Sequence, residues 1–199
     1  MADLWRSKNL IYRALEAEDA AIYCRLAAHS ESLSHDDQDL LTPKGTEHGK
    51  AKVERSRTRL IQVVICLADT IGTLTPIGTT SLHTEEGSAH HRHATLGIGI
   101  IRQYQDKGYG SEAIKCILNW GFRMANLHSI ELDAFSWNTR AIALYERLGF
   151  VHESRKREHL WFDGRYHDEV GMSMLLQDWE VKYGAGKQKH KSECDGVET

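Results

Sequence analysis

The chain has 199 residues, of which 41% are hydrophobic and 27% are charged, and its formal net charge is −3. This is enough for one well-buried core and too little for two full domains, so we expect a single domain over residues 1–183. The small net charge argues against a nucleic acid as a partner, and the lack of any apolar run near ~20 residues argues against a membrane.

Hydrophobic spacing predicts an alternation of strands and helices. Apolar runs rich in β-branched residues predict the strands, and apolar residues that recur every three or four positions predict the helices. In chain order we expect a strand at 10–14, a helix at 16–28, a polar loop at 30–58 with a helical piece at 49–57, strands at 60–68, 77–84 and 96–101, a helix at 107–125, a strand at 129–135 and a helix at 138–148.

The end of the chain predicts a hairpin and a tail. Trp161 and Phe162 lead into an Asp163-Gly164 turn, after which residues 170–176 predict the returning strand. Residues 184–199 are polar and show no periodicity, so they cannot bury enough apolar surface to offset the cost of ordering them. We therefore expect a disordered tail at 184–199.

A glycine-containing loop lies between the expected strand at 96–101 and the helix that follows. It reads Gln105-Asp106-Lys107-Gly108-Tyr109-Gly110. Glycines permit a tight turn, so backbone N–H groups can converge at the positive end of the helix dipole, and such a cradle binds phosphate. Lys107 could add a positive charge. By itself, the hexapeptide fits an ordinary turn between a strand and a helix equally well.

The following helix supplies a second motif. Residues 138–150 read NTRAIALYERLGF, and together with the glycine loop they resemble the GNAT superfamily of acetyl-CoA-dependent N-acetyltransferases. Segments 126–130, 144–146 and 163–168 are similar to spermidine acetyltransferases and ribosomal-protein alanine acetyltransferases. The resemblance implies an α/β (α+β) GNAT fold: a mixed, mostly antiparallel sheet of about seven strands, with helices on both faces and a fourth and fifth strand that splay apart.

The resemblance also implies the reaction and its partners. Acetyl-CoA would be the cosubstrate, without a metal, and a primary amine, polyamine-like or other, would be the acceptor; a homodimer is compatible with it. The backbone of the fourth strand would pair with the pantetheine arm, the glycine loop would hold the pyrophosphate and Asn138 would hydrogen-bond the cofactor. The implied cofactor-binding residues are Ile98, Ile100, Ile101, Gln105, Asp106, Lys107, Gly108, Tyr109, Gly110 and Asn138.

Tyr145 is the expected catalytic residue, because the resemblance points its hydroxyl at the sulfur of the cofactor. When an amine attacks a thioester, the departing thiolate needs a proton, and the conjugate acid of the model cysteine thiolate has a pKa of about 8.5. A phenol nearby can donate that proton. Without the flanking motif, Tyr145 would more often be a packing residue one helical turn from Ala141.

The base that takes the proton from the amine is not evident. Relatives often place a glutamate on the fourth strand, at the position that Thr95 holds here. Glu131 and Asp133 alternate on one side of the fifth strand and could accept the proton, directly or through water, or could lie at a solvated edge. A degenerate module that binds acetyl-CoA without transferring the acetyl group is therefore the alternative.

The remaining candidates have simpler interpretations. His90, His91 and His93 lack a carboxylate at metal-ligand spacing, so a solvated loop is the better interpretation. The acidic run at 36–39 could receive a cationic substrate, although such runs are usually solvated. The four cysteines show no paired spacing, which predicts reduced thiols in the cytosol, with the nucleus also compatible.

Overall fold

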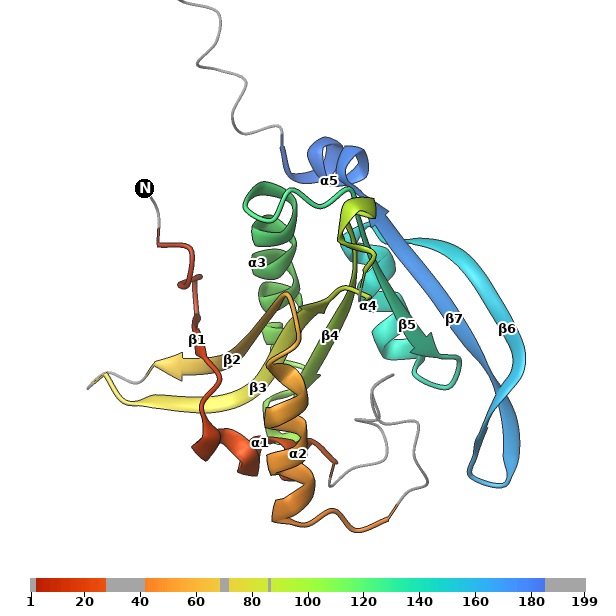
Figure 1. Cartoon of the computed structure of the whole chain (residues 1–199). Coiled ribbons are helices and arrows are strands. Elements are labelled where there is room, and N and C mark those ends of the chain that lie inside the picture. Colours follow the sequence, from red (N-terminus) through yellow and green to blue (C-terminus); the bar gives the residue numbers. More distant parts are fainter. Residues whose placement is uncertain (1–2, 28–41, 69–71, 86, 185–199) are drawn as a thin grey trace, which may run out of the picture.

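The computed structural model describes residues 3–27, 42–68, 72–85 and 87–184, which form a sheet flanked by helices (Figure 1). The strands are β1 (Leu10–Ala14), β2 (Ile61–Ala68), β3 (Leu74–His83), β4 (His93–Ile100), β5 (Ser129–Phe135), β6 (Val151–Phe162) and β7 (Arg165–Leu175). The helices are α1 (Ala20–Ala27), α2 (Thr46–Ser56), α3 (Tyr109–Arg123), α4 (Thr139–Leu148) and α5 (Leu176–Tyr183).

The seven strands lie in the order β1-β2-β3-β4-β5-β7-β6. Every neighbouring pair is antiparallel except β4 and β5, which are parallel. The pairing of β4 with β5 extends only from His93 opposite Ser129 to Thr95 opposite Glu131, although both strands continue. The mixed, mostly antiparallel sheet and the splayed fourth and fifth strands are both confirmed.

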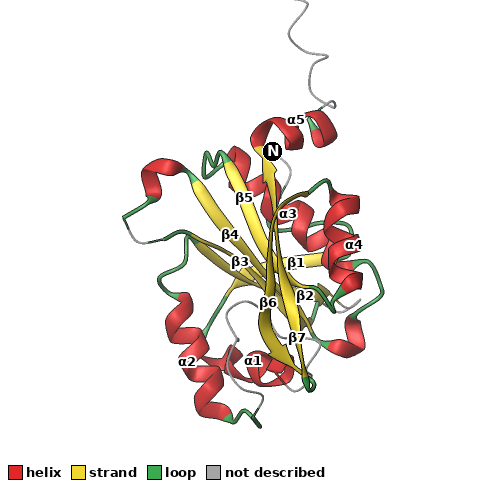
Figure 2. Cartoon of the chain, turned by 90° about the vertical axis from the view of Figure 1, so that its right-hand side faces the viewer, coloured by secondary structure: helices red, strands yellow, loops and turns green. Residues whose placement is uncertain are grey.

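Different helices cover the two faces of the sheet (Figure 2). On one face, here called the α3 face, the apolar stripe of α3 packs with Leu96 of β4 and Ile130 of β5. On the opposite face, the α1 face, Leu26 of α1 packs with Val64 and Cys66 of β2. Because side chains alternate along a strand, each residue of β4 faces one of these two layers and its neighbour faces the other.

Several elements begin at other residues than the sequence predicts. The helix expected at 16–28 starts at Ala20, after a 3₁₀ turn, because the carboxylate of Asp19 accepts a hydrogen bond from the N–H of Glu16 at 2.9 Å. Helix α2 starts three residues early at Thr46, and β3 three residues early at Leu74. Such end shifts reflect capping and pairing, which the apolar pattern does not encode.

The C-terminal region departs furthest from expectation. β7 starts at Arg165, five residues before the predicted strand, and is followed by α5, a helix that the sequence did not predict. Only Trp179 of α5 is buried, against Phe122 of α3 at 5.6 Å between ring centres. Leu176 and Tyr183 also pack on this core at helical spacing, but eight residues directly after a strand are too short a stretch for the apolar pattern to distinguish. The expected tail beyond residue 184 and the acidic run at 36–39 lie outside the described ranges.

The described residues contain three cysteines, Cys24, Cys66 and Cys116, and all three are unbridged thiols. In the same part of the chain, no group of three or more His, Cys, Asp or Glu side chains is arranged to hold a metal ion. None of the described helices has the length and apolar character needed to cross a membrane.

Candidate active site

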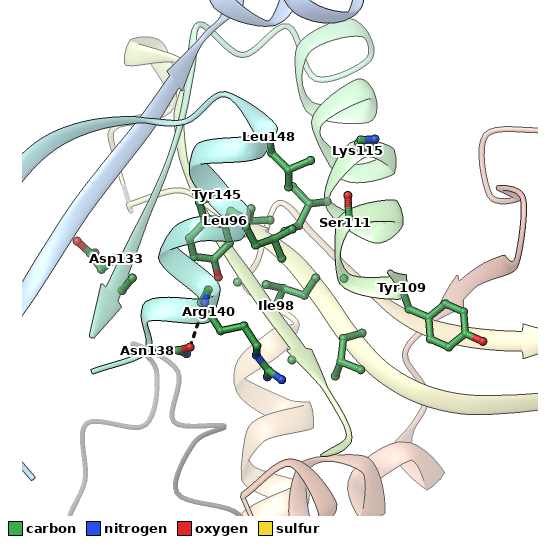
Figure 3. A pocket seen from close by; sticks show the side chains of 18 of the residues that line it. Leu96, Ile98, Tyr109, Ser111, Lys115, Asp133, Asn138, Arg140, Tyr145 and Leu148 are labelled. Carbon is green, nitrogen blue, oxygen red and sulfur yellow. Dashed lines mark hydrogen bonds between the residues drawn. The ribbon is translucent and has the colours of Figure 1, made fainter. Parts of the chain in front are cut away.

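A cavity of about 1170 Å³ opens where β4 and β5 diverge. Its walls come from these two strands, from the start of α3 and from α4 (Figure 3). The lining includes Leu96 and Ile98, which belong to the α3 face, and also Gly97 and Glu131, which belong to the α1 face. The cavity can therefore be reached from both faces of the sheet.

The backbone of β4 exposes alternate residues to this gap. The N–H of Ile101 donates to the carbonyl of Ile77 at 2.8 Å, and two residues earlier Gly99 lies opposite Thr79. The backbone N–H and C=O groups of Gly99 and the N–H of Ile101 are therefore directed toward β3. By the alternation of an antiparallel ladder, the N–H and C=O groups of Ile98 and Ile100 are directed toward β5. Ile98 and Ile100 line the cavity, whereas Ile101 is buried, bonds to Ile77 through its N–H and is not among the lining residues.

The glycine loop leads directly into α3. Gly108 has φ +83°, a left-handed conformation that favours glycine, and both Gly108 and Gly110 line the cavity. Tyr109 also borders it, but its ring is directed away from the cavity (Figure 3). Lys107 is not among the lining residues; its ammonium lies 5.7 Å from the centre of the Tyr104 ring. The loop thus offers mainly backbone N–H groups at the start of a helix, as predicted for an anion site.

Arg140 is a cavity residue that the sequence analysis missed. From the first turn of α4, its guanidinium binds both carboxylate oxygens of Asp106 at 2.8 and 2.9 Å and Oε1 of Gln105 at 2.5 Å. Nε2 of Gln105 in turn donates to the carbonyl of Ile100 at 2.8 Å. Gln105 and Asp106 therefore shape the loop, and Arg140 offsets the negative charge of Asp106 beside an expected anion site.

Two residues of α4 were predicted to act here. Asn138 caps the helix, because its Oδ1 accepts the N–H of Ala141 at 3.1 Å. The ring of Tyr145 projects from α4 into the cavity beside Leu96 (Figure 3) and contacts Phe150 edge-on at 5.9 Å between ring centres. Burial raises the pKa of Tyr145 to about 12. The raised pKa favours the protonated phenol at neutral pH. Its hydroxyl has no hydrogen-bond partner among the described residues, so it is available to a ligand.

A polar row crosses the sheet on the α1 face at the closed end of the gap. His83 of β3 lies opposite Thr95 of β4, which lies opposite Glu131 of β5. Oγ1 of Thr95 donates to Oε1 of Glu131 at 3.3 Å, and all three residues line the cavity. Asp133 follows on the same face of β5, where its side chain points away from Tyr145 (Figure 3).

Two arginines border the same part of the cavity. Arg59, just after α2, donates from Nη1 to the buried Oγ of Ser81 at 2.5 Å, and Arg55 is exposed at the end of α2. Together with Glu131 and Asp133, they give the α1-face part of the cavity charges of both signs.

Comparison with known proteins decides the family. The model of the acetyltransferase (GNAT) domain matches residues 9–151. The chain belongs to the GNAT acetyltransferase family. Spermidine N(1)-acetyltransferase of Vibrio cholerae is 38% identical to this GNAT chain over 85 residues, which is 43% of this chain and 49% of that enzyme. The [ribosomal protein uS5]-alanine N-acetyltransferase of Escherichia coli is 31% identical over 84 residues, or 42% of this chain and 43% of that enzyme.

The alignments with these two relatives each cover less than half of the relative's length. The structural likeness extends further. The crystal structure of spermidine N-acetyltransferase from Vibrio cholerae in complex with CoA and spermine superposes with a TM-score of 0.71 and 26% sequence identity, covering 87% of this GNAT chain and 99% of that one. The predicted GNAT fold and the similarity to spermidine and ribosomal-protein acetyltransferases are therefore confirmed.

Proposed function

We propose that this protein transfers the acetyl group of acetyl-CoA to a primary amine by direct attack within a ternary complex. The observation that carries the proposal is the position of Tyr145, whose hydroxyl enters the cavity between α4 and β4. A protein that only bound acetyl-CoA would have no use for a protonated phenol beside the thioester. Membership of the GNAT family and the similarity to acetyltransferases support the same reaction.

The α3-face part of the cavity suits acetyl-CoA. The pantetheine arm would pair with the backbone of Ile98 and Ile100 as an added strand does, and the pyrophosphate would rest on the N–H groups around Gly108 and Gly110. Besides the arginines described above, Lys115, Arg147 and Lys182 border the cavity and could balance the phosphate charges. The volume of about 1170 Å³ exceeds that of most small-ligand sites, as expected where a long cosubstrate and an acceptor meet.

The acceptor amine would approach from the α1 face, through the gap between β4 and β5. Its nitrogen attacks the acyl carbon, the C–N bond forms, the C–S bond breaks, and Tyr145 donates a proton to the sulfur. Holding both reactants in one cavity supplies much of the rate enhancement. None of the described cysteines lines the cavity, which agrees with transfer that needs no acyl-cysteine intermediate.

Release of free thiol from acetyl-CoA tests the proposal against the alternative of a degenerate binding module. Spermidine is the first acceptor to try, since the similar Vibrio cholerae enzyme is a spermidine acetyltransferase. Glucosamine, free alanine and a peptide with an N-terminal alanine complete the panel. We expect thiol release that depends on one of these amines, with the acetylated amine visible by mass spectrometry. Acetyl-CoA binding without amine-dependent release would instead favour the binding module.

The same cofactor site yields a prediction for Arg140. Arg140→Gln should raise the Kd for acetyl-CoA about tenfold, because Asp106 would then present an unbalanced charge beside the phosphates; one order of magnitude corresponds to about 1.4 kcal/mol. Isothermal calorimetry measures the change. Adding Asp106→Asn in the same chain should restore part of the affinity. If the double variant binds as weakly as Arg140→Gln, neutralising Asp106 is not the role of Arg140.

A further inference from the structure

The proposed reaction needs a group that accepts a proton from the amine, and Thr95 cannot serve as a base at neutral pH. Thr95 nevertheless holds a carboxylate, because its Oγ1 donates to Oε1 of Glu131 at 3.3 Å. We infer that Glu131 is the general base of this protein and that Thr95 is a positioning residue for its carboxylate. The inference rests on the proposed acetyl transfer and adds to it the second proton-transfer group.

The place of Glu131 in the sheet supports this role. Thr95 and Glu131 form the last pair before β4 and β5 separate, so the carboxylate lies at the closed end of the gap. The neighbours of Glu131 along β5, Ile130 and Leu132, are buried in the core on the α3 face. Glu131 therefore faces the α1 side, from which the amine approaches, while Tyr145 lies on the α3 side. A base and an acid on opposite sides of the thioester match an attacking nitrogen and a departing sulfur.

The surrounding groups favour Glu131 over its neighbour. The carboxylate of Asp133 is directed toward β7, since a Cβ added at Gly171 would lie 3.3 Å from its Oδ1. Glu153 of β6 accepts from Ser173, the partner of Glu131 in β7, at 2.6 Å. The titratable or charged groups around Glu131 are His83 of β3, Glu85 after β3, Asp133 of β5, Glu153 of β6, and Arg55 and Arg59 near the end of α2. Glu131 is the carboxylate that accepts the hydrogen bond of Thr95, at the point where β4 and β5 separate.

The proton balance follows from these two groups. A basic amine arrives as an ammonium ion at neutral pH, and Glu131 takes one proton so that the nitrogen lone pair can attack the acyl carbon. The C–N bond forms, the C–S bond breaks, and Tyr145 gives its proton to the sulfur. The second proton lost by nitrogen as the amide forms restores Tyr145, and the proton on Glu131 passes to solvent.

The test uses the full-length chain and thiol release with the fastest acceptor of the panel. Glu131→Gln should lower kcat/KM about a hundredfold at pH 7.5, at the lower end of general base effects. Wild-type kcat/KM should be independent of pH over the range between the pKa of a carboxyl group and the pKa of the amine. In Glu131→Gln it should rise about tenfold per pH unit, because only amine that is already neutral can react. A merely structural role would not change this slope.

Further variants separate the base from its support. Thr95→Glu added to Glu131→Gln should regain at least tenfold in kcat/KM, about 1.4 kcal/mol, since it returns a carboxylate from the neighbouring strand. Thr95→Val should lower kcat/KM only a few-fold, and its kcat/KM should stay independent of pH as in the wild type. Glu153→Gln makes the same charge change nearby and should stay within twofold of wild type.

Three results would overturn the inference. The first is wild-type kinetics in Glu131→Gln, and the second is a wild-type kcat/KM that already rises tenfold per pH unit. The third is a larger loss of kcat/KM in Asp133→Asn than in Glu131→Gln, together with a tenfold rise per pH unit. Unchanged acetyl-CoA affinity shows that each variant is folded. If Glu131→Gln does not fold, Glu131→Asp serves as a second variant. Wild-type protein that binds acetyl-CoA but shows no amine-dependent thiol release would contradict the proposed function itself. Activity in wild type with no effect at Glu131 contradicts the base assignment alone.

Discussion

Tyr145→Phe should lower turnover by about a hundredfold to ten-thousandfold while acetyl-CoA binding survives. The variant keeps the ring that packs against Phe150 and loses the hydroxyl that Tyr145 directs into the cavity. If the hydroxyl acts only in the transition state, kcat and kcat/KM fall together and the Kd for acetyl-CoA shifts little. Steady-state kinetics and calorimetry measure the two quantities separately.

The pH dependence of the wild-type protein checks the same role. Burial raises the pKa of Tyr145 to about 12, so the proton-donating form persists through neutral pH and is lost only as the pH rises toward that value. We therefore expect no loss of activity from ionisation of Tyr145 below about pH 11. Tyr166→Phe, on the exposed hairpin away from the cavity, is the matched control and should behave as wild type. Full turnover with unaltered pH dependence in Tyr145→Phe would make Tyr145 a packing residue.

Gly110→Trp should abolish acetyl-CoA binding without unfolding the protein. A Cβ at Gly110 would have only Leu144 within 4 Å, at 3.7 Å, so a side chain can grow into the cavity without meeting the core. There it occupies the space proposed for the pyrophosphate. Gly108 is less suitable for this test, because its φ of +83° would strain any other residue. Calorimetry should detect no binding by the folded variant.

Two further variants make the Gly110 result specific. Gly110→Ala adds a methyl group at ordinary contact distance from Leu144 and should keep measurable affinity. Gly45→Trp places the same bulky side chain in open space outside the cavity and should bind acetyl-CoA as the wild type does. Undiminished affinity in folded Gly110→Trp would contradict the assignment of this loop to the cofactor.

Features encoded by neighbouring residues were predicted well from the sequence. The strand at 129–135 was predicted with both of its ends, because a helix-breaking segment precedes it and a turn follows. The helix expected at 138–148 is found at 139–148, with Asn138 as its cap and Gly149 at φ +99° closing it. Each of these signals lies within a few residues of the feature that it determines, so the apolar pattern and the capping residues suffice.

Features that depend on contacts between distant segments were decided only by the tertiary structure. Arg140 and Asp106 are 34 residues apart, and Thr95 and Glu131 are 36 apart, so no local pattern links either pair. Ile101 was expected at the cofactor, but its N–H donates a hydrogen bond to the carbonyl of Ile77 because of the register between β4 and β3. The sequence by itself thus determined most of the helices and strands up to residue 148, the glycine loop and the position of Tyr145 on its helix. The structure decided which groups meet in the cavity, because strand register and the β4–β5 gap arise only when the whole sheet assembles.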